Sequence, residues 1–449
     1  MTSNMDEFEK MLSPKNEVIK IDIDDSKLKE NEINTIDVLE LQSKIKRMGE
    51  KLASEHAGTQ QGTNGDKNLI KVQRNMILSY LSDFSGCSWV RNQQIMNYLA
   101  WYFGRTNKLM VQTSGVFIFQ QDILMRCRAL FLQRFMSPIH LNVVRKYREM
   151  KNQLNMGYSL IVEHDDFLFW KDKERTINGI PEYNFGAKAI TNEVKNSAIE
   201  IMKLADKVVV STEYLAWYIK NELKIETPIT VSKNVVMQSW HKTQYEKHIT
   251  QRIVRVKILI TSSPTHYLNG TKEEPNKKLL GDFEPKMWNE YIIKNVKADK
   301  IDVVCMGGCP WFLEELKACK NFKVIEWLDS IRYSYVLKEE CKDAHFLFMP
   351  LVPNDFSAGK SDLKAIEAMA AGVIPIGSSF RYNNFDGPYN YLPASIPWDS
   401  DISVLEGMIE KYSNPDEYNG LLDWGNDYME KNGRYLESKQ FIDSFLKII

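Results

Sequence analysis

Two series of short apolar runs alternate with segments of helical spacing, and this alternation constrains the fold more than any other feature of the chain. Continuous apolar runs bounded by turns are typical of strands that are covered on both faces, as in parallel sheets. The first series begins near Met76 and the second near Val256. The sequence therefore predicts an α/β protein with two doubly wound, Rossmann-like domains.

The positions of these runs give the expected elements. Strands are expected at 76–81, 108–112, 116–119, 158–163, 207–211 and 229–232, and then at 256–260, 301–306, 322–325, 345–349 and 373–376. Helices are expected at 94–101, 123–154, 187–205 and 214–223, and then at 285–295, 310–319, 330–342 and 360–371. Ligands of parallel sheets lie at the carboxyl ends of the strands, so residues that directly follow a strand are the first site candidates.

Composition predicts four parts. Residues 1–66 are an acidic appendage that ends in a small, polar linker, because residues 1–40 carry a net charge of -6. Residues 67–245 and 246–430 are the two Rossmann-like domains, and residues 431–449 form a helix that returns to the first of them. A solvated tail is the favoured interpretation of residues 1–40, and a docking segment for a partner is the alternative.

The charge balance and the cysteines exclude several classes of protein. With 58 basic and 59 acidic side chains, the chain is not a generally basic nucleic-acid coat, although a local basic groove is compatible with this balance. The six cysteines are scattered, which indicates free thiols, and Cys305 and Cys309 lack the second pair that a zinc site needs. A polar start and the lack of an apolar run of about 20 residues predict a cytoplasmic protein, in the host cytoplasm if viral.

Residues 350–378 form the most informative segment, with a strand end, a polar loop, a helix and a second strand. Ser361 is expected at the helix start, where first-turn amides and the helix dipole favour an anion, and Lys360 adds positive charge. Lys364 and Glu367 share a helical face, so a diphosphate and the hydroxyls of a sugar or ribose are suitable ligands. An amphipathic helix with solvated side chains is the alternative. Gly372 is expected to end the helix.

This segment resembles the donor-binding segment of GT-B glycosyltransferases of the retaining, family-4 type. Lys360, Ser361, Lys364 and Glu367 match the Lys-Ser-x-x-Lys-x-x-Glu pattern of a subgroup common in phages and bacterial polysaccharide clusters. Further similar motifs follow the family's order at 85–91, 161–166, 205–212, 232–235 and 261–266, so the resemblance spans about residues 76–380. The chain departs from the family at Gly359, where an earlier glutamate is common, and at Lys233, where proline is usual.

The resemblance implies a hexosyltransferase whose two domains face a cleft and bind a nucleoside diphosphate sugar, with a UDP-sugar favoured. It implies no tightly bound cofactor and no metal requirement. The implied catalytic residues are His164, Asp165, Lys360 and Glu367. The implied donor-binding residues are Gly86, Arg91, Ser262, Thr265, His266, Gly307, Ser361, Lys364 and Glu367.

Alternatives stay open for several of these residues. His164 is a sugar or acceptor contact, or a structurally satisfied histidine. Asp165 and Asp166 are suitable for Mg²⁺ in principle, but acceptor binding or capping of the next turn is preferred. Arg91 is a phosphate ligand or an exposed helix residue, and Gly307 approaches the nucleotide base or forms a tight turn.

Two acceptors and one non-enzymatic role are compatible with the sequence. A hydroxymethylated pyrimidine in phage DNA is the first acceptor, and a surface or lipid-linked glycan is the second. Either would face a basic stretch expected on the helix 123–154, which contains Arg126, Arg128, Arg134, Arg145, Lys146, Arg148 and Lys151. A nucleotide-binding scaffold without catalysis is the alternative from a different class.

Overall fold

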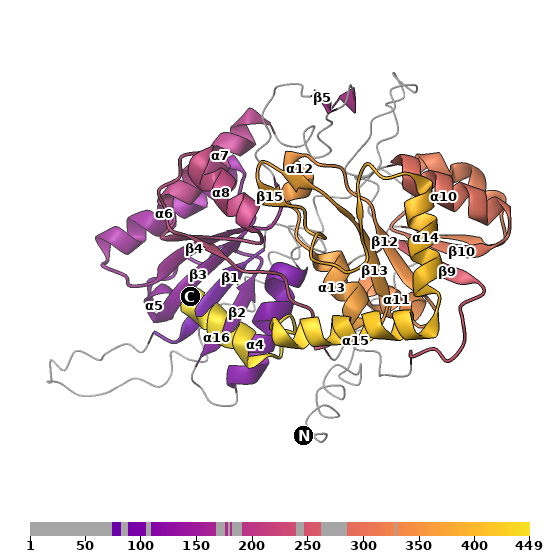
Figure 1. Cartoon of the computed structure of the whole chain (residues 1–449). Coiled ribbons are helices and arrows are strands. Elements are labelled where there is room, and N and C mark those ends of the chain that lie inside the picture. The colour runs from indigo at the N-terminus through magenta and orange to yellow at the C-terminus, as the bar shows by residue number, and fades with distance from the viewer. Residues whose placement is uncertain are drawn as a thin grey trace, which may run out of the picture. The chain divides into compact units, whose positions relative to one another are not determined.

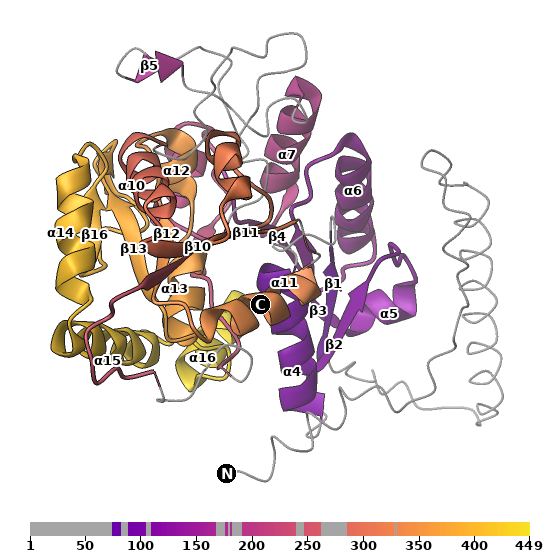
Figure 2. The ribbon, with the colours of Figure 1, turned by 90° about the vertical axis from the view of Figure 1, so that its right-hand side faces the viewer.

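The computed structural model describes residues 74–81, 89–104, 109–167, 176–177, 180–181, 191–238, 247–261, 285–326, 328 and 330–449. These residues belong to one unit of the chain, which begins at Lys71. Two parallel six-stranded sheets, each covered by helices, form this unit (Figures 1 and 2). The predicted fold class is therefore confirmed, whereas the appendage 1–66 lies outside the described residues.

The first sheet has the strand order β2-β1-β3-β4-β7-β8, and all neighbouring strands are parallel. Its strands are β1 (Met76–Tyr80), β2 (Met110–Ser114), β3 (Cys127–Gln133), β4 (Ser159–His164), β7 (Lys207–Val210) and β8 (Ile229–Val231). Its helices are η4 (Trp89–Gln93), α4 (Gln94–Gly104), α5 (Gln121–Arg126), α6 (Pro138–Gln153), α7 (Asn192–Leu204) and α8 (Glu213–Asn221). Leu160 of β4 packs in the cluster that contains α6, whereas Ile161 packs in the cluster that contains α4, so both sheet faces are covered.

The second sheet has the strand order β11-β10-β9-β12-β13-β16, again all parallel. Its strands are β9 (Val256–Thr261), β10 (Ile301–Met306), β11 (Phe322–Ile325), β12 (Phe346–Met349), β13 (Ile374–Ser379) and β16 (Ser395–Pro397). Its helices are α10 (Pro285–Lys297), η6 (Trp311–Ala318), α11 (Ser330–Cys341), α12 (Asp355–Gly359), α13 (Leu363–Ala370), α14 (Ile402–Tyr412) and α15 (Pro415–Lys431). The strand order reverses between β9 and β12, which is where ligands of such sheets bind.

The last helix, α16 (Lys439–Ile448), packs on the first sheet although it follows the second in the chain. Its residues Phe441, Ile442 and Phe445 lie in one cluster with Ile77 of β1 and Phe131 of β3 (Figure 1). The chain end is also held by polar contacts, since Arg128 donates to the carbonyl of Ile449 at 3.3 Å. The C-terminal helix therefore ties the ends of the described unit together.

The predicted helix 123–154 is wrong, because a central strand interrupts it. Residues Cys127–Gln133 form β3, between β1 and β4. Strand β3 is almost wholly buried, and a continuous apolar run of this kind has the same composition in a strand and in a buried helix. The start of α6 has a local signal in the sequence, because Ser137 caps this helix and Pro138 occupies its first turn.

The predicted strand at 116–119 is also wrong. These residues form no strand, and their polar backbone groups bond to side chains instead. The N–H of Ile118 donates to the hydroxyl of Tyr80 at 3.0 Å, and the N–H of Val116 donates to Ser114 Oγ at 3.1 Å. The apolar character of Phe117 is explained by its contact with the Tyr80 ring, at 5.6 Å between ring centroids.

Two antiparallel hairpins, β5–β6 (Thr176–Ile177, Ile180–Pro181) and β14–β15 (Arg381–Tyr382, Phe385–Asp386), lie outside the main sheets.

Candidate functional site

Strand β4 ends at His164, which is fully buried at 0% exposure. Burial lowers the pKa of His164 to about 3, and the nearby positive charge of Arg134 adds to this effect. The imidazole is therefore neutral near pH 7 and can exchange hydrogen bonds, but it does not carry a second proton to donate as an acid. The residue lies at the predicted strand end, but its ring is enclosed by protein.

Arg134 pairs with both aspartates that follow His164. Its Nε donates to the Asp165 carboxylate at 2.5 Å, and a terminal nitrogen pairs with the Asp166 carboxylate. The hydroxyl of Ser211 donates to the backbone carbonyl of Asp165 at 2.7 Å. One guanidinium thus binds both carboxylates and offsets one of their two negative charges, a role that the expected basic helix does not include. Among the residues that the structure describes, no group of three or more His, Cys, Asp or Glu side chains is placed to hold a metal.

Arg91 is a buried link between three segments, with 3% of its surface exposed. Its Nε donates to Glu163 Oε1 at 2.6 Å. A terminal nitrogen donates to the carbonyl of Ser232 at 2.7 Å and to Asn234 Oδ1 at 2.8 Å. The alternative of an exposed helix residue is therefore wrong, and these described contacts are all to protein groups.

The same hydrogen-bonded chain reaches the second sheet. The amide nitrogen of Asn234 donates to the hydroxyl of Ser361 at 2.6 Å. Because Asn234 also accepts from Arg91, the chain runs from Glu163 at the end of β4 to the loop after β12. It brings predicted site residues from both sheets, Arg91 and Ser361, to the two sides of one amide.

The loop after β12 contains a bend that the predicted helix 360–371 did not include. Asn354 caps α12, with its side chain accepting from the N–H of Ser357 at 2.7 Å. Lys360 then has extended backbone angles, and α13 begins only at Leu363. Lys360 and Ser361 therefore lie between two helices and not in the first turn of one. At the other end, Gly372 has a φ of 68° and terminates α13 as predicted.

Positive charge gathers around this bend. The Lys360 ammonium lies 4.4 Å from the centroid of the Phe356 ring. Lys364 lies in the first turn of α13, and its charge acts on the Glu367 carboxylate. Two lysines and the Ser361 hydroxyl thus flank the N-terminal end of α13, where the helix dipole also favours an anion.

Glu367 is buried within α13, with 5% of its surface exposed. Burial raises the pKa of this carboxyl to about 7, although Lys364 and a hydrogen bond from Tyr333 oppose the shift. The Tyr333 hydroxyl of α11 donates to Oε2 at 3.4 Å. A buried carboxylate with one long hydrogen bond keeps acceptor capacity, which is what binding of vicinal hydroxyls requires.

We expect Glu367→Gln to make the protein more stable at pH 8 than the wild type. The raised pKa means that the folded state holds a proton that the unfolded chain releases, so the contribution of Glu367 to stability is lost as the pH rises through about 7. The amide cannot ionise, and the expected gain at pH 8 is up to about 3 kcal/mol. Urea unfolding at pH 5 and pH 8 checks this. Glu314→Gln, which changes an exposed carboxylate of η6, is the control and should show no such gain.

A second ion pair fixes the bend from the other side, and its partners are too far apart in the chain for a local pattern to predict it. Arg434, only 2% exposed, pairs with the carboxylate of Asp362. The Tyr391 hydroxyl donates to the other oxygen of Asp362 at 3.0 Å. The carbonyl of Arg434 accepts from the N–H of Val236 at 3.0 Å. The bend is therefore held at Ser361 by Asn234 and at Asp362 by Arg434.

Gly359 lies where no side chain fits, which gives a physical account of the departure from the family's glutamate. A Cβ at this position would lie 2.9 Å from Phe167 Cβ and 3.3 Å from Leu215 Cδ2. The hydroxyl of Thr212 also donates to the Gly359 carbonyl at 3.3 Å. The backbone here approaches the first sheet's residues closely, and a larger residue must displace them.

Gly359→Glu is accordingly expected to destabilise the protein by about 1–3 kcal/mol through overpacking. The comparison is Gly407→Glu in α14, where a Cβ would meet no atom within 4 Å. That control should unfold at or slightly above the wild-type urea concentration, because glutamate is the better helix former. Equal unfolding midpoints for the two variants would show that the close packing at Gly359 is unimportant.

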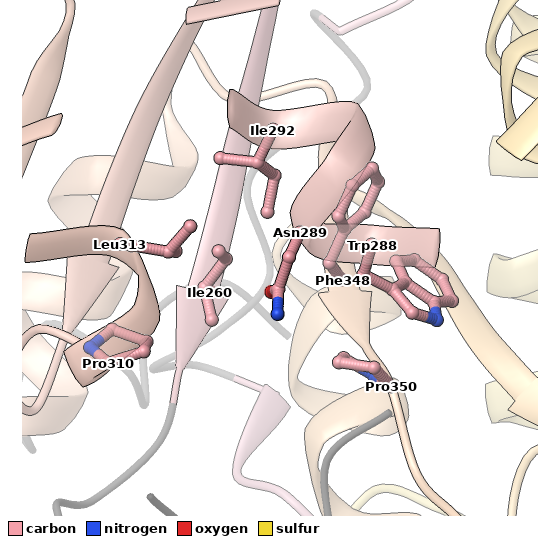
Figure 3. Close-up of a pocket in the computed structure, with 8 residues that line it drawn as sticks. All are labelled: Ile260, Trp288, Asn289, Ile292, Pro310, Leu313, Phe348 and Pro350. Atoms are coloured by element: carbon pink, nitrogen blue, oxygen red, sulfur yellow. The ribbon is translucent and has the colours of Figure 1, made fainter. Parts of the chain in front are cut away.

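Gly307 follows β10 in a tight turn, in agreement with the simpler of its two interpretations. Gly307 and Gly308 have φ of 96° and 120°, and both N–H groups donate to the carbonyl of Ile325. A small hollow lies nearby, where the strand order reverses, bordered by Ile260 of β9 and Pro350 after β12 (Figure 3). Its volume of about 10 Å³ is enough for one water molecule but not for a nucleotide base.

Four of the seven basic side chains of the stretch pair with carboxylates, and the stretch spans three elements. Arg148 and Lys151 of α6 both bind Asp206, at 2.6 and 2.5 Å. Lys146 pairs with Glu149 at 3.1 Å. Together with the pairing of Arg134, this leaves much less positive charge for a polyanionic acceptor than the sequence indicates.

Four of the predicted donor-binding residues lie outside the described residues, and they stay predictions. They are Gly86, Ser262, Thr265 and His266.

No described helix is long and apolar enough to cross a membrane.

The comparisons with known proteins give a likeness of fold. Sucrose-phosphate synthase from Thermosynechococcus elongatus is 11% identical, covers 84% of this chain and 100% of its own, and has a TM-score of 0.50. Anabaena Alr3699/HepE, in complex with UDP and glucose, is 9% identical over 84% of this chain and 100% of its own, with a TM-score of 0.49. TarM is 12% identical over 73% of this chain and 56% of its own, with a TM-score of 0.47. No model of a protein family and no curated protein matches the sequence.

Proposed function

We propose that this chain is a glycosyltransferase that moves a hexose from a nucleoside diphosphate sugar, with a UDP-sugar favoured, to an acceptor hydroxyl. The observation that carries the proposal is the bend after β12, where Lys360 and Ser361 lie beside Lys364 and Glu367. This bend is held at Ser361 by the amide of Asn234, which Arg91 also binds. The fold likeness to a sucrose-phosphate synthase, an enzyme named for the synthesis of a sugar phosphate, supports the proposal.

In the proposed reaction, the acceptor oxygen forms a bond to the anomeric carbon while the bond from that carbon to the phosphate oxygen breaks. The electron pair leaves with the nucleoside diphosphate, and the acceptor's proton passes to a phosphate oxygen. Lys360, Lys364 and the N-terminal end of α13 stabilise the negative charge that develops on the leaving group. Glu367 accepts hydrogen bonds from the ribose hydroxyls, and retention of anomeric configuration is part of the proposal.

His164 and Asp165 have supporting roles in this proposal. The neutral imidazole of His164 exchanges a hydrogen bond with the donor sugar, which requires the groups packed over the ring to move when the donor binds. Asp165 is oriented by Arg134 and receives the acceptor. We assign acceptor binding to residues 67–245 and donor binding to residues 246–430, with residues 431–449 returning to the former.

The acceptor favoured by the described residues is a glycan and not DNA. Four of the seven basic side chains of the stretch are engaged with carboxylates, which leaves fewer cations to contact phosphates: Arg134, Lys146, Arg148 and Lys151. A hydroxymethylated pyrimidine in DNA stays an outcome of the test.

The test is release of nucleoside diphosphate from UDP-, GDP- and ADP-sugars, with no acceptor, with a bacterial glycan mixture, with plain DNA and with hydroxymethylated DNA. We expect slow release from one donor without acceptor and faster release with the glycans. Stimulation by hydroxymethylated DNA alone would keep the transferase and replace the acceptor. Donor binding without any release would favour a nucleotide-binding scaffold.

A further inference from the structure

A groove runs along α8, outside the transfer site, and it has the volume of a ligand site. It measures about 420 Å³, within the range of small-molecule pockets. Its lining comes from the outer face of α8, from the loop before β8 and from Phe385 of the β14–β15 hairpin. The lining residues that matter here are Glu213, Trp217, Lys220, Glu226, Thr227 and Phe385.

The lining combines aromatic rings with charged and hydroxyl groups. Trp217 is partly exposed, and its ring centroid lies 5.5 Å from that of Phe385. Glu213, Lys220 and Glu226 are exposed around these rings, and Thr227 adds a hydroxyl. A sugar ring has an apolar C–H face that packs on an aromatic ring and an edge of hydroxyls that bond to carboxylate, ammonium and hydroxyl groups. The groove offers both kinds of partner side by side.

The charge of the groove distinguishes between the two candidate acceptors. Two carboxylates and one ammonium give a net charge of -1 among its titratable side chains. A groove with one lysine offers few of the cationic contacts on which DNA binding depends, whereas a chain of neutral or basic sugars does not need them. The groove therefore favours a polyhydroxylated ligand.

The groove also leads toward the proposed transfer site. Glu213, the first residue of α8, lines one end of the groove. The hydroxyl of the preceding residue, Thr212, donates to the carbonyl of Gly359, next to Lys360. Tyr214 donates to the Asp355 carboxylate of α12, on the same loop. From Glu213 to Lys220 the helix rises about 10 Å, so the groove is long enough for more than one sugar ring.

We propose that the α8 groove binds the sugar chain of a glycan acceptor, with Trp217 as the stacking platform. The inference rests on the proposed glycosyl transfer for its role, but the binding itself is independent of turnover. It assigns the acceptor class that the transfer site alone does not specify.

The experiment is binding of the full chain to a printed array of neutral, basic and acidic oligosaccharides, followed by calorimetric titration with the best array ligand and with duplex DNA. We expect Trp217→Ala to weaken glycan binding by about tenfold, and Trp217→Phe to weaken it less. Because Trp217 also packs on Tyr214, the double change Lys220→Ala with Glu226→Ala, at exposed positions, provides a second test that does not disturb the core. Lys203→Ala, an exposed position on α7, is the control.

Several outcomes overturn the proposal. These are no binding to any array member, wild-type binding by both Trp217→Ala and the double variant, or DNA binding that the same changes weaken. Its failure is separable from failure of the proposed function. Glycan binding that depends on Trp217 in a protein that releases no nucleoside diphosphate would retain the groove and reject the transferase. Transfer to glycans that is insensitive to Trp217 would do the reverse.

Discussion

Replacement of Lys360 by alanine is expected to lower kcat for sugar transfer by about 10²–10³-fold, with a smaller change in KM. Lys360 lies in the bend between α12 and α13, directly before Ser361, and its ammonium lies over the Phe356 ring. Its positive charge stabilises the transition state more than the bound donor, because the diphosphate gains negative charge as the bond from the anomeric carbon to the phosphate oxygen breaks. Initial rates of nucleoside diphosphate release over a range of donor concentrations provide both constants.

Two further variants make the Lys360 prediction specific. Lys360→Arg keeps the charge but not the compact ammonium, so we expect an intermediate rate. Lys342→Ala changes an exposed lysine that pairs with Glu339 at 2.6 Å near the end of α11, and it should retain the wild-type rate. A wild-type kcat for Lys360→Ala, or an equal loss for Lys342→Ala, would remove Lys360 from the proposed mechanism.

Arg91→Leu is expected to destabilise the protein by about 3–5 kcal/mol near neutral pH. The change leaves Glu163 buried at 0% exposure without its counter-ion, and it also removes donors from Ser232 and Asn234. Burial already raises the pKa of Glu163, and Arg91 opposes that shift. Without Arg91 the pKa rises further, so the loss of stability should be smaller at pH 5 than at pH 8.

Urea unfolding followed by circular dichroism measures this effect. Glu163→Gln in the Arg91→Leu background should recover part of the loss, because the buried charge is then absent. Arg252→Leu breaks an exposed pair with Glu410 and should change the unfolding midpoint little. If Arg91→Leu and Arg252→Leu unfold alike, the buried chain from Glu163 to Ser361 does not stabilise the fold.

The strands were predictable where the apolar run and the turn that ends it are both local. The apolar runs of β4, β7, β9 and β10 predict strands, because their composition alone distinguishes them from the polar turns on either side. Strand β3 was not predictable in this way, since the apolar residues of α5, β3 and α6 follow one another closely. Pairing with β1 and β4 decides its conformation, and that pairing is not local.

The candidate site was predictable as residue types but not as geometry. The spacing of Lys360, Ser361, Lys364 and Glu367 is in the sequence, and the helix interior with Gly372 at its end follows from local rules. The bend at Lys360 depends instead on Arg434, Asn234 and the tight packing at Gly359.

The buried charges illustrate the same limit. The position of an arginine near a helix start predicts an exposed or a ligand-binding side chain. Arg91 is instead buried, where it donates hydrogen bonds to Glu163, Ser232 and Asn234. Its carboxylate partner is 72 positions away in the chain. The local sequence shows that such a charged residue is present. Which residues neutralise its charge depends on the tertiary fold.

The most direct test of glycosyl transfer is a balanced count of both products from labelled nucleotide sugars, each offered separately, measured by mass spectrometry for the wild type and for Lys360→Ala. We expect the wild type to form one nucleoside diphosphate for each sugar found on the glycan or in water, and Lys360→Ala to form both about 10²–10³-fold more slowly. Equal, background-level formation by both proteins with every nucleotide sugar offered would contradict glycosyl transfer and leave the fold without this activity.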